Sequence, residues 1–151
     1  MSERRKIRLE VVTPERVEFS RDVDSIMAPA YDGYIGILPG HIPLVTRLNV
    51  GVLRIGIDGE YTNMAVSEGY MEVTPSKVVV LAEAAELPEE IDVERALEAK
   101  RKAEELLANG IERISVIQAQ IALEKAINRL KVAKYKNGAA HRRVPSDAKV
   151  E

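Results

Sequence analysis

Short runs of alternating polar and apolar residues fill the first 88 positions, the pattern of half-buried β-strands. The first run is 6–11, Lys-Ile-Arg-Leu-Glu-Val, and Thr13-Pro14 ends it at a turn. Further strands are predicted at 25–28, 51–57, 61–66, 69–73 and 77–82. Asp58-Gly59 between two such runs predicts a hairpin with a type I′ turn, which needs positive φ at both central residues. Short strands at this spacing favour a sandwich or barrel, because an open sheet exposes its edges.

After Pro88 the period of the apolar residues changes to that of a helix. The segment 89–107 contains no Gly or Pro, and Asn109-Gly110 predicts a helix end with Gly110 in the left-handed region. A second helix is predicted from Ile111 or Ser115 to about Tyr135. The apolar stripes of this helical hairpin are Ala96, Ala99, Ala103, Leu106 and Leu107, then Ala119, Leu123, Ala126, Ile127, Leu130 and Ala133. Three segments are therefore predicted: a β domain at 1–88, a helical hairpin at 89–135 and a flexible tail at 136–151.

Charge and residue size point to a weakly held hairpin. Alanine buries little apolar area, so an alanine seam gains little at about 25 cal/mol per Å². The segment 89–107 has seven acids and four bases, whereas 111–143 has two acids and eight bases. One interpretation is a solvated face with ion pairs inside the hairpin. The other is a detachable arm whose basic second helix binds an acidic partner.

Composition excludes several classes of function. The 151 residues carry a net charge of −2, which is unsuited to neutralising nucleic acid. There is no Cys, and there are only His41 and His141, so thiol chemistry, a histidine metal cage and a Ser-His-Asp relay are not expected. No apolar run has the length of a membrane span, and the N-terminus does not resemble a signal peptide. We expect no catalytic residue and no metal site.

Glycine and proline are concentrated at 32–44, Asp-Gly-Tyr-Ile-Gly-Ile-Leu-Pro-Gly-His-Ile-Pro-Leu. The segment is neither a dinucleotide fingerprint nor a phosphate-binding P-loop. It predicts a tightly turned loop that presents Tyr34, Ile35, Ile37 and Leu38 near the surface, as a docking loop would. For His41, a structural hydrogen bond is weighed against a catalytic role, which no neighbouring acid or nucleophile supports.

Ile91-Asp92-Val93-Glu94-Arg95-Ala96 opens the first helix. Asp92 is placed as an N-cap, which alone explains its presence. The spacing also puts Asp92 and Arg95 on one face, where Lys125 and Arg129 of the second helix could join them to hold a polyphosphate.

These residues give the chain a close resemblance to the epsilon subunit of bacterial and chloroplast F-type ATP synthases, called delta in mitochondria. Three stretches carry it: 33–46 with Gly-Ile-Leu-Pro-Gly-His, 66–73 with Val-Ser-Glu-Gly-Tyr-Met-Glu-Val, and 92–106 with Arg95-Ala96. The resemblance extends over about residues 6–135. It implies an antiparallel β-sandwich of about ten strands followed by a helix-turn-helix, with a tail longer than the family's.

The resemblance implies a non-catalytic rotor subunit whose sandwich links gamma to the c ring. The implied c-ring-facing loop comprises Tyr34, Gly36, Pro39, Gly40 and His41. The hairpin is implied to extend along gamma toward the beta subunit and to restrain ATP hydrolysis through a basic second helix. Its candidate residues are Arg113, Lys125, Arg129, Lys131 and Lys134. The implied location is the cytoplasmic face of the bacterial plasma membrane, or the stromal thylakoid face, with membrane contact only through the c ring and no nucleic acid.

Some bacterial members of the family bind ATP through [Ile/Leu]-Asp-x-x-Arg-Ala. Candidate ATP-binding residues here are Glu86, Ile91, Asp92, Arg95, Ala96 and Arg129. Two further arginines of tight binders correspond to Lys102 and Lys125, and lysine lacks the bidentate fork of arginine. We therefore expect no required cofactor and at most weak regulatory ATP. A free-standing ATP-sensing module is the alternative function, and an enzyme using His41 is a third.

Overall fold

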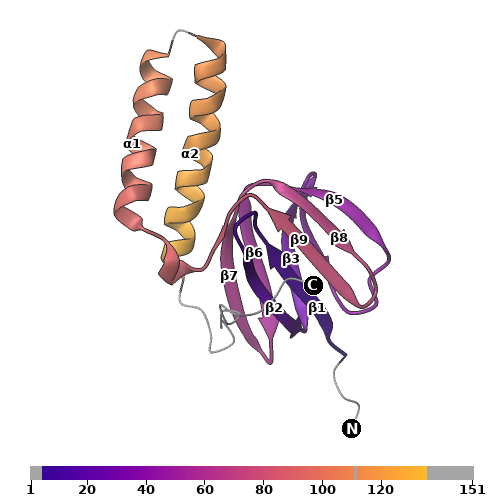
Figure 1. Cartoon of the computed structure of the whole chain (residues 1–151). Coiled ribbons are helices and arrows are strands. Elements are labelled where there is room, and N and C mark those ends of the chain that lie inside the picture. Colours follow the sequence, from indigo (N-terminus) through magenta and orange to yellow (C-terminus); the bar gives the residue numbers. More distant parts are fainter. Residues whose placement is uncertain (1–4, 111, 136–151) are drawn as a thin grey trace.

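The structure, a computed structural model, describes residues 5–110 and 112–135; the predicted tail at 136–151 lies outside the described residues. A ten-stranded sheet precedes two helices that stand to one side of it (Figure 1). The strands are β1 (Ile7–Val12), β2 (Val17–Val23), β3 (Ser25–Ala30), β4 (Gly33–Ile37), β5 (Leu44–Leu48), β6 (Gly51–Ile57), β7 (Glu60–Val66), β8 (Gly69–Val73), β9 (Lys77–Ala82) and β10 (Ala85–Glu86). The expected fold class, a sandwich of about ten strands followed by a helical hairpin, is confirmed.

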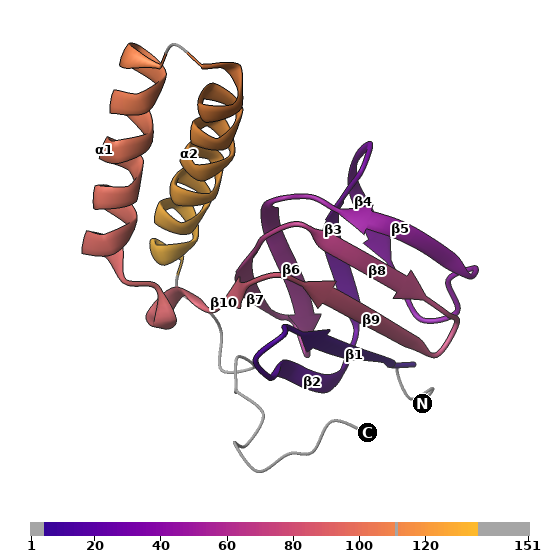
Figure 2. The same ribbon diagram turned by 45° about the horizontal axis from the view of Figure 1, so that its top comes forward.

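The sheet folds back on itself, so that its two halves enclose one core (Figure 2). Its strand order is β10-β7-β6-β3-β5-β8-β9-β1-β2, and β4 pairs with β3. The expected antiparallel sandwich contains one parallel pair, because β1 pairs with β9 in parallel, with Leu9 opposite Val78. A parallel pair needs a long connection, and here the strands β2 to β8 supply it.

One face of each strand fills the core of the sandwich. In β1, the buried residues Ile7, Leu9 and Val11 alternate with partly or fully exposed ones, as the strand period requires. The same core includes Phe19, Ile26, Ile37, Leu48, Leu53, Ile55, Met64, Met71, Val78, Val80 and Leu87. The β6–β7 turn confirms the hairpin prediction, since Asp58 (φ 50°) and Gly59 (φ 83°) both adopt positive φ.

Four strands were not predicted from the pattern: β2, β4, β5 and β10. The expected docking loop is partly strand, because Gly33–Ile37 forms β4 and pairs with β3. Ile37, expected near the surface, is fully buried in the core. Glycines at 33 and 36 and prolines close by hide the strand period, while cross-strand pairing supplies the conformation.

The helical hairpin comprises α1 (Val93–Asn109) and α2 (Arg113–Ala133), and the 3-10 turn η1 (Pro88–Glu90) precedes it. Asp92 caps α1 as predicted, because the Arg95 backbone N–H donates to Asp92 Oδ1 at 3.0 Å. The left-handed conformation expected for Gly110 is wrong: its φ is −70°, so α1 ends without that cap. A Cβ at this position would lie 2.5 Å from the Leu106 carbonyl oxygen, so close approach of the backbone explains the glycine.

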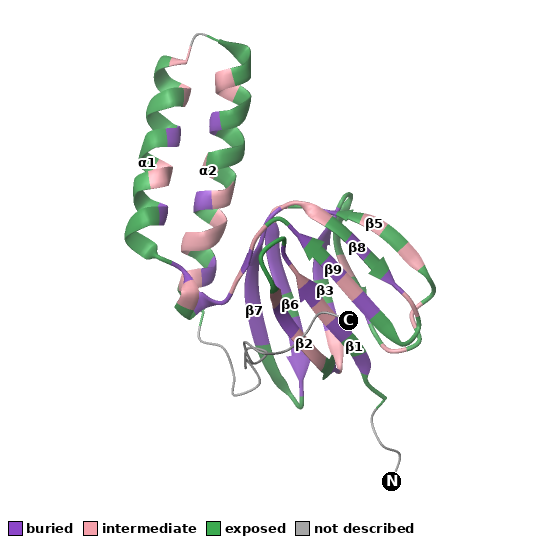
Figure 3. Cartoon of the chain, viewed as in Figure 1, coloured by how far each residue is buried: buried purple, intermediate pink, exposed green. Residues whose placement is uncertain are grey.

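Alanines form the seam between the two helices. Ala96 and Ala103 of α1 and Ala119 and Ala126 of α2 are buried (Figure 3). Leu106 and Ile127, predicted in the same stripes, are instead about half exposed, which leaves the seam to the small residues. The helices therefore approach closely but bury little apolar area.

Only the end of the hairpin near η1 meets the sandwich, and the helices then diverge from it (Figures 1 and 2). The main contacts of α1 are with α2, whereas α2 also contacts β6, β7 and η1. A small apolar cluster, separate from the main core, joins the two parts: Val52, Ala65, Ile91 and Val132, with Ala133 against it. Neither α1 nor α2 combines the length and hydropathy of a membrane span.

Candidate functional site

Two bases of α2 reach across to the sandwich. Lys125 Nζ lies 2.9 Å from Glu68 Oε1 and 3.7 Å from Glu83 Oε2. One turn farther, Arg129 donates to Glu86 Oε1 through Nε at 2.7 Å and Nη2 at 2.6 Å. Lys125 and Arg129 project from one face of α2 because positions four apart share a face. We call the two bases and their three carboxylate partners the docking cluster: Lys125, Arg129, Glu68, Glu83 and Glu86.

Between these bases, Asn128 fixes α2 to the backbone of the sandwich. Its Nδ2 donates to the Gly51 carbonyl oxygen at 2.8 Å. Nearby, Ser67 holds the segment before β10 to β7, because the Ala84 N–H donates to Ser67 Oγ at 2.7 Å. The acidic residues of the docking cluster are thereby carried on fixed backbone.

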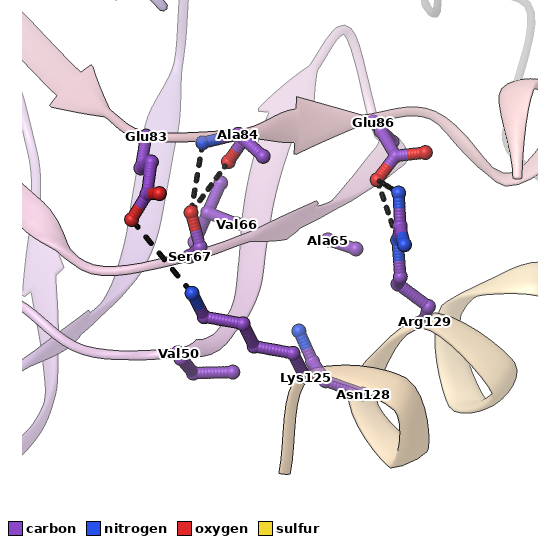
Figure 4. A pocket seen from close by; sticks show the side chains of 10 residues that line it. All are labelled: Val50, Ala65, Val66, Ser67, Glu83, Ala84, Glu86, Lys125, Asn128 and Arg129. Carbon is purple, nitrogen blue, oxygen red and sulfur yellow. Dashed lines mark hydrogen bonds and ion pairs between the residues drawn. The ribbon is translucent and has the colours of Figure 1, made fainter. Parts of the chain in front are cut away.

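A cavity of about 190 Å³ lies between α2 and the sandwich at this cluster (Figure 4). Lys125 and Arg129 point from the helix toward the strands, where Glu83 and Glu86 receive them. The cavity is lined by Val50, Ala65, Val66, Ser67, Glu83, Ala84, Glu86, Lys125, Asn128 and Arg129. Its volume is below the roughly 300–1,000 Å³ of small-molecule sites.

The ion pair perturbs both partners. Burial is the largest single influence on Glu68 and raises its pKa, but the hydrogen bonds from Lys125 and the backbone, the contact with Glu83 and the charge of Lys125 together outweigh burial and lower the Glu68 pKa below its usual 4.5. The hydrogen bond to Glu68 raises the pKa of Lys125 above its usual 10.5. Both groups therefore carry charge at neutral pH.

The candidate ATP-binding residues are only partly brought together. Glu86 and Arg129 are in direct contact, and Ile91 packs in the small apolar cluster beside α2. Asp92 is engaged in its capping bond, and Arg95 is exposed on α1; neither lines the cavity at the docking cluster. Ala96 is buried in the helix seam.

The candidate c-ring-facing residues fall on two parts of the sandwich. Tyr34 and Gly36 belong to β4, and the Val52 N–H donates to the Tyr34 hydroxyl at 3.0 Å, in a groove also lined by α2. Pro39, Gly40 and His41 lie in the β4–β5 loop. This loop is on the side of the sandwich away from the hairpin (Figure 2).

Hydrogen bonds within the β4–β5 loop and to the β8–β9 connection hold the loop in shape. The Gly40 N–H donates to the Pro75 carbonyl at 2.8 Å, and Gly40 has a φ of 87° that favours glycine. His41 Nδ1 lies 2.7 Å from the Ile42 carbonyl oxygen, as a structural histidine would. The flanking Leu38 and Ile42 are 62% and 75% exposed, so an apolar tip projects from a fixed loop.

The remaining bases are Arg113 and Lys131 of α2 and Lys134 at its C-cap. Within the part of the chain that the structure describes, Arg113, Lys131 and Lys134 form no ion pair. No ion pair joins α1 to α2 within that part, although the charges of the two helices suggested one. The acids of α1 instead pair with bases of α1, as Arg101 does with Glu98 and Glu105.

Sequence reasoning named Glu86 but missed Glu68 and Glu83, the other two carboxylates of the docking cluster. Glu68 and Glu83 each stand in short connections and belong to no motif considered for ATP. The one sequence signal for these two carboxylates was the excess of positive charge in the second helix, which predicts acidic partners but not their positions.

Two protein-family models match consecutive parts of this chain. The beta-sandwich domain of the ATP synthase Delta/Epsilon chain matches residues 6–88, and the long alpha-helix domain of the same chain matches residues 89–134. The chain belongs to the ATP synthase delta/epsilon family. The suspected family resemblance is thus confirmed, and the family's two domains correspond to the sandwich and hairpin described above.

Individual members of the delta/epsilon family are similar over most of their length. An ATP synthase epsilon chain of Desulforamulus reducens is 53% identical over 126 residues, covering 83% of this chain and 96% of the relative. An ATP synthase epsilon chain of Bacillus licheniformis is 44% identical over 128 residues, covering 85% and 98%. A chain in the structure of the Euglena gracilis mitochondrial ATP synthase, OSCP/F1/c-ring, has a TM-score of 0.74 and 26% identity, with 86% of this chain and 82% of that chain covered.

Proposed function

We propose that this chain is the epsilon subunit of a proton- or sodium-translocating F-type ATP synthase, a non-catalytic part of the rotor stalk on the cytoplasmic face of the membrane. The observation that carries the proposal is the two-part architecture. A sandwich with its own core bears a hairpin attached at one end, and both parts match the family in order. The similar Euglena chain was solved in an ATP synthase assembly that includes the c ring.

In this role the sandwich transmits torque between gamma and the c ring. The hydrogen-bonded β4–β5 loop with its exposed Leu38 and Ile42 is suited to contact an apolar partner. Tyr34 is less suited to contact the partner, because its hydroxyl accepts a hydrogen bond from the Val52 N–H of β6. Stable co-purification with gamma tests the proposal, and a chain that never associates with gamma contradicts it. That outcome would favour the free-standing ATP-sensing module.

The hairpin is proposed to restrain ATP hydrolysis when it leaves the sandwich and reaches the beta subunit. Arg113, Lys131 and Lys134 are unpaired within the described chain and would attract an acidic surface at once, whereas Lys125 and Arg129 would first have to leave the sandwich. Replacing these five bases with alanine should relieve inhibition in the assembled enzyme and leave coupled synthesis intact. Unchanged ATPase activity would exclude an electrostatic clamp.

Regulatory ATP is proposed to bind weakly at the hairpin. Glu86 and Arg129 are in direct contact, and Ile91 packs in the small apolar cluster between α2 and the sandwich, which supports the site. Against tight binding stand the small cavity, the engagement of Arg129 by Glu86, and lysine at 102 and 125. Isothermal titration of the full chain with ATP should show a dissociation constant above the micromolar range, and a submicromolar value contradicts this proposal.

A further inference from the structure

The bases of α2 divide into two groups by their surroundings. Lys125 and Arg129 are held by carboxylates of the sandwich, whereas Arg113, Lys131 and Lys134 have no ion-pair partner among residues 5–110 and 112–135. An acidic partner of the hairpin thus meets three available bases and two that are already occupied.

The three carboxylates come from separate connections but converge on one face of α2. Glu68 lies between β7 and β8, Glu83 between β9 and β10, and Glu86 in β10. Within the described residues, their ion pairs are with Lys125 and Arg129 alone. Three acids facing two bases form a small acidic surface, the same chemistry that an acidic protein partner would offer to α2.

We propose that Glu68, Glu83 and Glu86 act as an intramolecular acceptor that competes with an acidic protein surface for Lys125 and Arg129. This inference rests on the proposed role of α2 in binding such a surface. The competition is direct because the charged ends of Lys125 and Arg129 face the sandwich carboxylates at 2.6–2.9 Å, in the space that a partner surface would have to occupy. Docked and partner-bound hairpins are therefore mutually exclusive, and the carboxylates set the balance between them.

The test uses the full chain and a fluorescent poly-L-glutamate peptide as the acidic probe, with binding followed by fluorescence anisotropy. The test variant is Glu68→Gln with Glu83→Gln and Glu86→Gln. The matched control, Asp32→Asn with Glu60→Gln and Glu72→Gln, removes the same number of charges at exposed positions that have no ion pair within the described residues. We expect about tenfold tighter binding by the test variant than by the control, because affinity rises with the fraction of chains that can bind.

Two further sets of substitutions show whether a gain in peptide affinity comes from release of Lys125 and Arg129 or from a general change in the fold. Adding Lys125→Ala and Arg129→Ala to the test variant should remove the gain, whereas adding Arg113→Ala and Lys134→Ala should weaken the wild type and the test variant equally. Equal affinity of the test and control variants overturns the proposal, as does a gain that survives loss of Lys125 and Arg129. Failure of the proposed function appears separately, as absence of association with gamma.

Discussion

Val132 connects α2 to the sandwich, and its truncation should undock the hairpin without unfolding the rest. The side chain is fully buried in the small cluster with Val52, Ala65 and Ile91. Val132→Ala removes about 1.6 kcal/mol of transfer free energy, with a further contribution from the cavity left behind. The better helix propensity of alanine returns about 0.5 kcal/mol. The docking free energy should therefore weaken by about 1.5 kcal/mol, which lowers the docking equilibrium constant roughly tenfold.

A thiol reporter measures this change cleanly because the chain contains no Cys. Ala65→Cys places a thiol in the small apolar cluster, where reagents should reach it only after the hairpin leaves. Val132→Ala should raise its labelling rate about tenfold. Ile127→Ala is the matched control, since Ile127 is 48% exposed on the same helix and gains similar helix propensity.

A second reporter distinguishes undocking from unfolding. Val80→Cys places a thiol in the main core of the sandwich. Its labelling rate should not respond to Val132→Ala. Equal acceleration at both thiols would show that hairpin and sandwich open together, and no acceleration at position 65 would show that the small apolar cluster does not hold the hairpin. Either result refutes the reasoning.

Three further predictions concern single sites. Asp92→Ala should cost the hairpin about 1 kcal/mol in a far-ultraviolet circular dichroism melt, while Asp92→Asn should retain most of the stability. Gly69→Ala should prevent folding of the sandwich, because the new Cβ would lie 1.8 Å from a β9 carbonyl oxygen, whereas Gly36→Ala, with its nearest contact at 3.7 Å, should fold; soluble yield and melting temperature decide. The Glu68–Lys125 ion pair should contribute fully to docking between pH 4.5 and pH 10.5; its contribution should be lost as pH falls through the lowered pKa of Glu68, and again as pH rises through the raised pKa of Lys125. Nuclear magnetic resonance shifts of α2 report both transitions, and Glu68→Gln should remove the part of the acidic transition that is due to Glu68.

Local signals in the sequence predicted the elements that depend on local chemistry. Asp58-Gly59 specifies the β6–β7 hairpin, and Asp92 specifies the start of α1, because each acts through its own backbone neighbours. β2 was missed because charged residues interrupt its alternation, and its pairing with β1 shifts register between Val11 and Val12. The parallel partner of β1 depends on a strand far along the chain, which no local pattern reveals.

The α2 side of the candidate site could be predicted from the sequence, whereas on the sandwich side only Glu86 was named, through the family resemblance. Helical spacing placed Lys125 and Arg129 on one face of α2, and the charge excess of that helix called for acidic partners. Arg129 and Glu86 are 43 residues apart, and Asn128 and Gly51 are 77 apart. Contacts of that separation arise from the closing of the sandwich, so their partners follow from the tertiary fold and not from any motif.

The chemistry of the docking surface decides whether the hairpin can leave the sandwich. Undocking exposes a small apolar cluster of Val52, Ala65, Ile91 and Val132, whereas the main core stays closed. Lys125 and Arg129 are only partly buried, so their contribution to docking is screened, and water can solvate them and their carboxylates once they separate. The alanine seam would stay intact on undocking, because α1 packs chiefly against α2. A surface of this kind binds with a small free energy, which an acidic partner of comparable strength can overcome.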